Sequence, residues 1–246
     1  MESFGLVNYF ASAGLLYAFE KATPASKLIL LLLVLASSLS WTVIIVKLGQ
    51  LRFARRQTHR FLQRLRAGDW YLPFVNQERF SGSPEHAIYS SAFRELLRQA
   101  YPPSRHGDPP LEKLLPGISV KPAAMKAVQG AIEREIGIQG LLLEEQMVLL
   151  ATAASGAPFL GLLGTVWGVM DAFSDIAIVG KASLAAMAPG VSGSLICTVT
   201  GLLVAIPALF AYNFLVATIR SHTIRMENFA AELQSELERS FLEPEL

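Results

Sequence analysis

Two long stretches without a charged residue decide the fold of this chain. They read MVLLATAASGAPFLGLLGTVWGVM at residues 147–170 and ASLAAMAPGVSGSLICTVTGLLVAIPALFAYNFLVATI at residues 182–219. A helix needs about 20 apolar residues to cross a bilayer, so each stretch is long enough to span one. As a single helix the second would measure about 57 Å, at about 1.5 Å per residue. That exceeds the hydrocarbon thickness of about 30 Å, so part of it must tilt or continue beyond the membrane.

The overall composition also indicates a membrane protein. Of 246 residues, 52% are hydrophobic and 17% are charged, and the mean hydropathy is +0.41, which is too apolar for an ordinary soluble domain. The net charge of +1 predicts no nucleic-acid partner. The single cysteine, Cys197, lies in an apolar span and fits a small packing residue. No metal-ligand spacing and no catalytic set is apparent, so we expect no metal, no cofactor, no catalytic residues and no enzyme activity.

A basic cluster sets the expected orientation. Residues 28–46 form the first predicted span, and seven basic residues follow it directly: Lys47, Arg52, Arg55, Arg56, Arg60, Arg64 and Arg66. By the positive-inside rule this side is cytoplasmic, so the N-terminus lies outside. Leucines at helical spacing carry the helix on to about Gly68. The apolar stretch 4–19 is short for a span and predicts a helix at the membrane surface, with a fourth span as the alternative.

The cytoplasmic segments are expected to be helical as well. Ser83-Pro84-Glu85 has the signature of a helix start, and that helix should end near Tyr101, before a proline-rich stretch. From Ala123 an amphipathic pattern leads without a proline into residue 147, which predicts one long helix that rises into the second span. A last helix should pack against these cytoplasmic parts. His86 and His106 are interpreted as structural or exposed histidines.

The predicted fold is therefore an all-α membrane protein, with three transmembrane helices and long cytoplasmic helical extensions. Its segments, in chain order, are a periplasmic or interfacial helix at 1–27, spans at 28–46, 147–170 and 184–215, a cytoplasmic region at 47–146, a short periplasmic turn at 171–183 and a cytoplasmic C-terminal helix at 216–246.

Small and hydroxylated residues recur on the second and third spans. Glycines let membrane helices approach closely, and this predicts a packing role for Gly161, Gly164, Gly168, Gly193 and Gly201. Pro158, Pro189 and Pro207 are predicted pore or hinge positions. A lone threonine can bond its own i−4 carbonyl, but two hydroxyl stripes on consecutive helices favour a shared polar lumen. The predicted ion-path residues are Thr165, Thr198, Ser194 and Thr200.

Three motifs carry a family resemblance: PFLGLLGTVWGVM at 158–170, APGV at 188–191 and GLLVAIPA at 201–208. In these the chain resembles the TolQ/ExbB branch of the MotA/TolQ/ExbB proton channels. The resemblance implies a bacterial inner-membrane pentamer whose pore encloses a TolR/ExbD-type dimer, with a TolA- or TonB-type protein as a further partner. It also implies that proton flow performs work on the envelope. The family's two pore threonines fall on Thr165 and Thr198.

One position departs from that family, because Gly193 stands where it usually has a glutamate. The last two predicted spans contain no ionisable residue, so the group that changes charge is expected on the partner. Thr200, on nearly the same helical face as Gly193, is expected to add polar lining. A TolQ-type, an ExbB-type and a motility-engine subunit all remain open, as do H⁺ or Na⁺ as the ion. A non-conducting membrane scaffold is the alternative of a different class.

Overall fold

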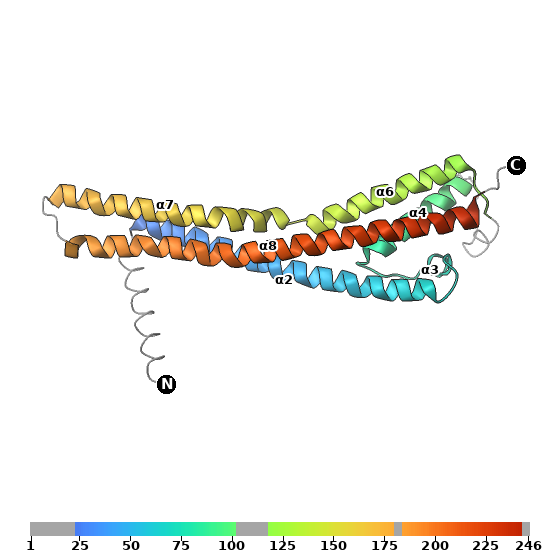
Figure 1. The fold of residues 1–246 in the computed structure, drawn as a ribbon, viewed down its shortest axis with the longest axis horizontal. Coiled ribbons are helices and arrows are strands. Elements are labelled where there is room, and N and C mark those ends of the chain that lie inside the picture. Colours follow the sequence, from blue (N-terminus) through green and yellow to red (C-terminus); the bar gives the residue numbers. More distant parts are fainter. Residues whose placement is uncertain (1–22, 102–117, 180–183, 243–246) are drawn as a thin grey trace, which may run out of the picture. The chain divides into compact units, whose positions relative to one another are not determined.

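The computed structural model describes residues 23–101, 118–179 and 184–242. The predicted surface helix at 4–19 and the predicted structural His106 lie outside these ranges. The helices are α2 (Pro24–Arg66), α3 (Leu72–Val75), α4 (Pro84–Ala100), α6 (Pro122–Glu144), α7 (Met147–Val179) and α8 (Leu184–Phe241) (Figure 1). Within the described ranges there is no strand, only an isolated parallel bridge between Val120 and Leu242. Three helices are long and apolar enough to cross a membrane, which confirms the predicted fold class.

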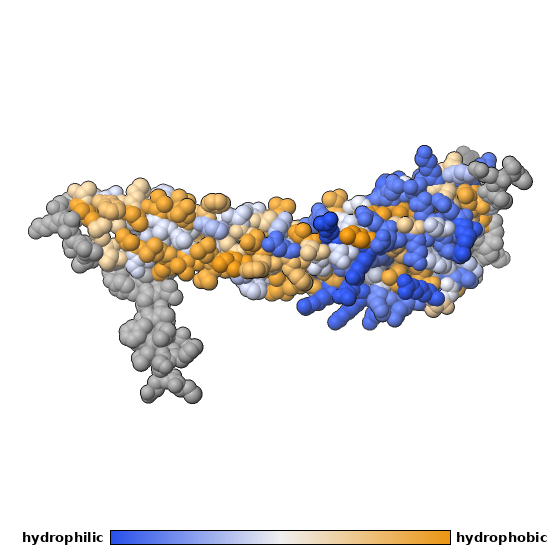
Figure 2. All heavy atoms as spheres, viewed as in Figure 1, coloured by the Kyte–Doolittle hydropathy of each residue, from blue (hydrophilic) through white to orange (hydrophobic). Residues whose placement is uncertain are grey.

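The chain divides into two compact units. Among the described residues, the first unit comprises 23–46, 146–179 and 184–214, and the second comprises 47–101, 118–145 and 215–242. In the first unit a small core joins Ile29 and Leu33 of α2 to Ala157 of α7 and to Val204 and Ala205 of α8. Many large apolar side chains of this unit point outward, as helices surrounded by lipid require, and its surface is mainly hydrophobic (Figure 2).

The second unit has a conventional buried core with a hydrophilic surface (Figure 2). Phe61 of α2 lies at its centre and packs against Tyr89 of α4 and Phe229 of α8, with ring centroids 5.3 and 5.8 Å apart. Val128 and Ile132 of α6 close the core from another side. The C-terminal part of α8 therefore packs against the other helices of this unit, as the sequence predicted.

The predicted helix starts and stops are largely confirmed. At the start of α4 the Ser83 side chain accepts a hydrogen bond from the His86 backbone N–H at 3.2 Å, and Pro84 occupies the first turn. The helix α2 ends at Arg66, close to the predicted stop at Gly68. It begins at Pro24, slightly earlier than expected, because the Thr23 hydroxyl accepts a hydrogen bond from the Ser26 N–H at 3.3 Å and caps the first turn.

Two expectations about the second predicted span are wrong. The preceding helix α6 does not continue into it, because a turn at Glu145 and Gln146 separates α6 from α7, and Gln146 has a positive φ of 66°. The Lys47 ammonium donates to the Leu142 and Leu143 carbonyls, both at 3.3 Å, and so stabilises the end of α6. In addition, residues 171–179 are helical and belong to α7 instead of forming a turn.

Candidate functional site

The helices α7 and α8 meet along a glycine-rich line, which we call the α7–α8 seam. It is built from Gly161, Gly164, Thr165 and Gly168 of α7 and from Ser194, Cys197, Thr198 and Gly201 of α8. A methyl group at Gly161 would lie 2.7 Å from the Cys197 carbonyl oxygen, and one at Gly201 would lie 2.6 Å from the Ala157 carbonyl oxygen. Since membrane helices attract one another mainly through such close packing, these glycines allow the two backbones to touch.

Further along the seam the contacts are with side chains. A methyl group at Gly164 would lie 2.5 Å from the Cys197 Cβ, and one at Gly168 would lie 2.5 Å from the Ser194 Cβ. Ser26 of α2 also borders the Gly168 position, with its hydroxyl oxygen at 3.3 Å. Gly193 is buried. Four of the five glycines singled out in the sequence thus lie directly at helix contacts.

Two threonine hydroxyls bridge the seam. Thr165 donates to the Gly161 carbonyl at 2.9 Å, Thr198 approaches the same oxygen at 3.1 Å, and the two hydroxyls are hydrogen-bonded to each other. Both side chains are half-buried. The two hydroxyl groups make three contacts but have only two protons. In one arrangement Thr165 donates to Thr198 and Thr198 donates to the Gly161 carbonyl, and in the other the two threonines exchange these roles. The pair therefore has two alternative hydrogen-bond arrangements of similar geometry.

The remaining predicted site residues do not join this pair. Ser194 is buried and donates to the Val191 carbonyl of its own helix at 2.8 Å. Thr200 is two residues beyond Thr198, which places it on roughly the opposite face of α8. Pro158 and Pro207 are half-buried inside α7 and α8, and Pro189 lies near the start of α8. The structure thus brings together Thr165 and Thr198 from a longer set of hydroxyl residues.

The seam is electrically neutral. No Asp, Glu, Lys, Arg or His occurs between residues 147 and 170 or between 190 and 219, and the described residues contain no cluster of acidic, histidine or cysteine side chains suited to a metal ion. Hydroxyl and carbonyl groups can orient water or receive a hydrogen bond, but they do not change charge near neutral pH. The seam itself therefore offers hydrogen-bond donors and acceptors but no group that titrates near neutral pH.

Sequence reasoning missed that two charged side chains of the second unit are buried. Lys47 is only 1% exposed, although it was interpreted as one member of the basic cluster. The helical spacing of Lys47 with Leu51, Ala54 and Thr58 places it on the buried stripe of α2, and that signal could have revealed it. The second group is the Glu85 carboxylate, also buried, which accepts a hydrogen bond from Thr58.

Comparison with known proteins defines the class. Residues 83–228 match the model of the MotA/TolQ/ExbB proton channel family, and the chain belongs to this family. It is 34% identical to the Tol-Pal system protein TolQ of Pseudomonas aeruginosa, over 89% of this chain and 90% of that protein. It is 33% identical to TolQ of Haemophilus influenzae, over 93% of this chain and 96% of that protein. It is 32% identical to a biopolymer transport protein ExbB of Xanthomonas campestris, over 84% of this chain and 78% of that protein.

These matches confirm the resemblance to the TolQ/ExbB branch. Together with three helices of spanning length they make the chain an inner-membrane protein of a proton channel family, and not an enzyme.

Proposed function

We propose that this chain is a TolQ-like stator subunit that converts proton motive force into mechanical work on the cell envelope, together with a TolR/ExbD-type partner. The observation that carries the proposal is the Thr165–Thr198 hydroxyl pair on an otherwise neutral seam. In this proposal several copies, five by resemblance to the family, surround the transmembrane helices of a partner dimer. The N-terminus lies in the periplasm and the C-terminus in the cytoplasm.

The chemistry of the pair suits a partner carboxyl group in both of its protonation states. A hydroxyl donates to a carboxylate and accepts from a protonated carboxylic acid. One proton that crosses a potential of 100 mV releases about 2.3 kcal/mol, whereas a typical hydrogen bond contributes a net of about 0.5–1.5 kcal/mol. Each proton can therefore break and reform the one or two hydrogen bonds that join the partner to the pair.

Gly193 supports a mechanism without a carboxylate on this subunit. It is buried where the resemblance places a glutamate, and an unpaired carboxylate in such a place is costly unless it stays protonated. In our proposal Thr165 and Thr198 provide the ion path, with Ser194 as a secondary polar group on the same stripe of α8. Thr200 lies on roughly the opposite face of that helix and is not part of the path. The ion is H⁺ rather than Na⁺, since the pair offers few oxygen ligands for a metal cation.

An ExbB-type role, in which the subunit energises a TonB-type protein, is the second candidate. The observation in its favour is the similarity to ExbB at 32% identity, close to the values for the two TolQ proteins. Neighbouring genes for a TolA-type or a TonB-type protein would distinguish the two roles. A motility engine uses the same parts, and a non-conducting scaffold would use the hydroxyls for helix contacts alone.

Reconstitution tests the proposal. Liposomes that contain the chain and its TolR/ExbD-type partner should conduct protons down a pH gradient, whereas liposomes with the chain alone should conduct poorly. Strong, pH-dependent flux from the chain alone would contradict the need for an external titrating group. No flux with the partner would favour the scaffold.

The proposed orientation has its own test. In intact inner-membrane preparations, a thiol reagent added from the periplasmic side should label Lys181→Cys and leave Arg60→Cys unlabelled. Labelling at position 60 from that side would reverse the orientation.

A further inference from the structure

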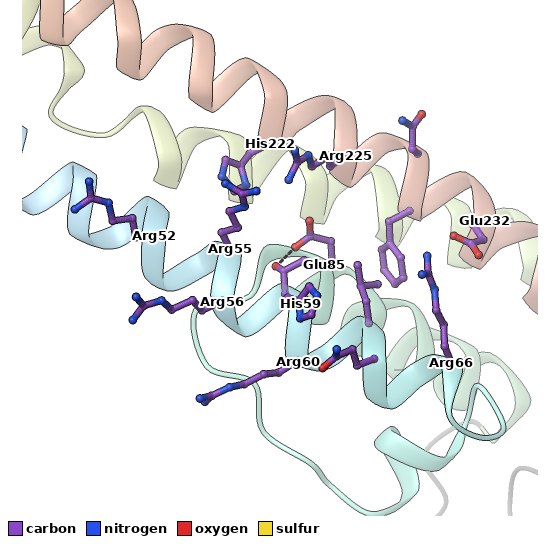
Figure 3. Close-up of a pocket in the computed structure, with 15 residues that line it drawn as sticks. Arg52, Arg55, Arg56, His59, Arg60, Arg66, Glu85, His222, Arg225 and Glu232 are labelled. Carbon is purple, nitrogen blue, oxygen red and sulfur yellow. Dashed lines mark hydrogen bonds between the residues drawn. The ribbon is translucent and has the colours of Figure 1, made fainter.

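The second unit carries a strongly basic groove between α2 and α8. It has a volume of about 970 Å³, and we define this basic groove by its six arginines: Arg52, Arg55, Arg56, Arg60, Arg66 and Arg225. Figure 3 shows Arg55 extending from α2 toward His222 of α8, with Arg225 of the same helix next to His222. Only two carboxylates line the groove, and one of these, Glu85, is buried and bonded to Thr58. The groove therefore has a large excess of positive charge.

The six guanidinium groups of the groove are exposed and have no partner of opposite charge. Among the described residues, none of the six arginines has a carboxylate oxygen within 4.0 Å, since the ion pairs involve Arg64, Arg98 and Arg239 instead. Each guanidinium group carries five N–H donors in a planar fork that matches the geometry of a phosphate or a carboxylate. The groove is thus a site that an anionic ligand would complement.

The inner end of the groove, defined by Arg52, Arg55 and Arg225, is within reach of lipid headgroups. Arg52 and Arg55 lie six and nine residues beyond Val46, the end of the predicted first span. At about 1.5 Å per residue these positions are about 9 and 14 Å from that end. An arginine stem can lie along the protein and carry its guanidinium group back toward the membrane by about 6 Å. The headgroup layer is about 5–8 Å thick, so both guanidinium groups can reach it.

The helix α8 gives the same depth for the inner end. Its charge-free stretch ends at Ile219, and Arg225 lies six residues further, as many as separate the first arginine of the groove from the first span. Large apolar side chains are exposed at this level: Phe53 of α2 is 51% exposed and Ile224 of α8 is 49% exposed. Apolar side chains next to exposed arginines are typical of helices at a membrane interface. The inner end therefore has the character of an interface with lipid.

The outer end of the groove has different surroundings. Arg60 and Arg66 lie fourteen and twenty residues beyond Val46, or about 21 and 30 Å, which is beyond the reach of the headgroups. The exposed carboxylate of the groove, Glu232, lies at the same end as Arg66 (Figure 3). Depth and charge together thus distinguish the inner end as the place for an anionic headgroup.

We propose that the inner end of the basic groove binds the phosphate group of an anionic phospholipid from the adjoining leaflet. Arg52 and Arg55 of α2 contact the phosphate from one side and Arg225 of α8 from the other, so that one lipid joins the two helices. Arg55 and Arg225 both lie near His222, whose pKa is lowered first by burial and then by these two charges, against the effect of Glu85. A bound phosphate therefore relieves their mutual repulsion. Basic pockets between helices beside a membrane select anionic headgroups in this way.

This inference goes beyond the proposed function and does not depend on it, because it requires only that α2 and α8 cross a membrane. Lipid retention by the purified full-length chain tests it. The chain is placed in mixed micelles that contain equal amounts of phosphatidylglycerol and phosphatidylcholine, and the bound lipids are counted by native mass spectrometry. The original chain should retain phosphatidylglycerol in preference to phosphatidylcholine by about tenfold or more.

Two double variants locate the site within the groove. Arg55→Gln with Arg225→Gln should lower the retention of phosphatidylglycerol by roughly tenfold or more. The matched control, Arg60→Gln with Arg66→Gln, removes the same charge from the outer end of the groove. It should lower retention by less than about twofold, because charges more than a Debye length from the headgroups are screened.

Thermal melts of the same samples separate lipid binding from a purely structural effect. In phosphatidylcholine alone, Arg55→Gln with Arg225→Gln should be at least as stable as the original chain, because the variant removes a repulsion between like charges. In phosphatidylglycerol the order should reverse, because only the original chain gains stability from the bound lipid.

Three results would overturn the inference. Equal loss of phosphatidylglycerol from the two double variants, or no preference over phosphatidylcholine, would show that the inner end is not a headgroup site. Displacement of the lipid by inorganic phosphate, under conditions where chloride of the same ionic strength has no effect, would assign the groove to a soluble anion. An equal loss of stability in both lipids on Arg55→Gln with Arg225→Gln would give these arginines a structural role only.

Discussion

Paired substitutions at Gly164 of α7 and Cys197 of α8 test how tightly these two helices pack along the α7–α8 seam. In Gly164→Ala the new methyl carbon would lie 2.5 Å from the Cys197 Cβ and 2.8 Å from its Sγ. Carbon atoms at optimal separation are about 3.5–4.0 Å apart, so the helices would have to separate by about 1 Å. Overpacking of this size costs about 1–3 kcal/mol. Gly164→Ala should therefore reduce thermal stability in detergent and reduce proton-driven activity.

The same contact predicts a specific rescue. Cys197→Gly alone should also destabilise, by about 2 kcal/mol, because it empties a buried site and places a glycine inside a helix. In the double variant the alanine methyl group takes up the space that the Cys197 side chain leaves. A double-mutant cycle should therefore give a favourable coupling of about 1–3 kcal/mol between the two positions.

Two further variants make the reasoning falsifiable. Gly161→Ala meets the Cys197 carbonyl oxygen at 2.7 Å, so Cys197→Gly should not rescue it. Gly156→Ala, on the same helix with no atom within 4 Å, should be neutral or slightly stabilising. Additive effects of Gly164→Ala and Cys197→Gly, or equal damage from Gly156→Ala, would refute the close packing of α7 and α8.

Three other predictions concern the second unit. Ser83→Ala removes the cap of α4 and should lower the free energy of unfolding by about 1–2 kcal/mol, while Ser83→Thr should retain most of it, measured by thermal denaturation. Lys47→Met leaves the last carbonyls of α6 without their donor and should lower the free energy of unfolding by about 1–3 kcal/mol. Lys126 is exposed, so Lys126→Met should leave that free energy almost unchanged. Burial lowers the pKa of His222, a shift that Glu85 opposes and that Arg225 and Arg55 support. Below about pH 6.5 the His222 side chain therefore binds a proton more readily in the unfolded chain than in the folded chain. The free energy of unfolding should decrease as the pH is lowered through this range. A His222→Gln variant should show a weaker pH dependence in the same melts, and an unchanged slope would contradict this assignment.

Most of the fold could be predicted because its signals are local. A charge-free stretch of about 20 residues defines a span, and Ser83-Pro84 defines a helix start wherever it occurs. The break between α6 and α7 could not be predicted in this way. No proline or glycine stands at Glu145 or Gln146, and the carbonyls just before the turn bond to a lysine almost a hundred residues away in the sequence.

In the candidate site, too, the local features could be predicted from the sequence and the contacts between helices could not. Helical periodicity placed Gly161 and Thr165 on one stripe of α7, and Ser194 and Thr198 on one stripe of α8. It could not show that these stripes face each other within one chain, since that depends on how α7 and α8 pack. Nor could it separate Thr198, which reaches the Gly161 carbonyl of the opposite helix, from Ser194, which bonds to its own helix.

Proton flux through threonine variants tests the central claim most directly. In liposomes that contain the TolR/ExbD-type partner, Thr165→Val and Thr198→Val keep the side-chain shape but remove a hydroxyl. Each should reduce flux about tenfold, the effect of losing one hydrogen bond of about 1.4 kcal/mol. Thr165→Ser and Thr198→Ser keep the hydroxyl and should conduct at close to the original rate. Full flux from both valine variants, in complexes assembled normally with the partner, would contradict the claim that this hydroxyl pair forms the ion path.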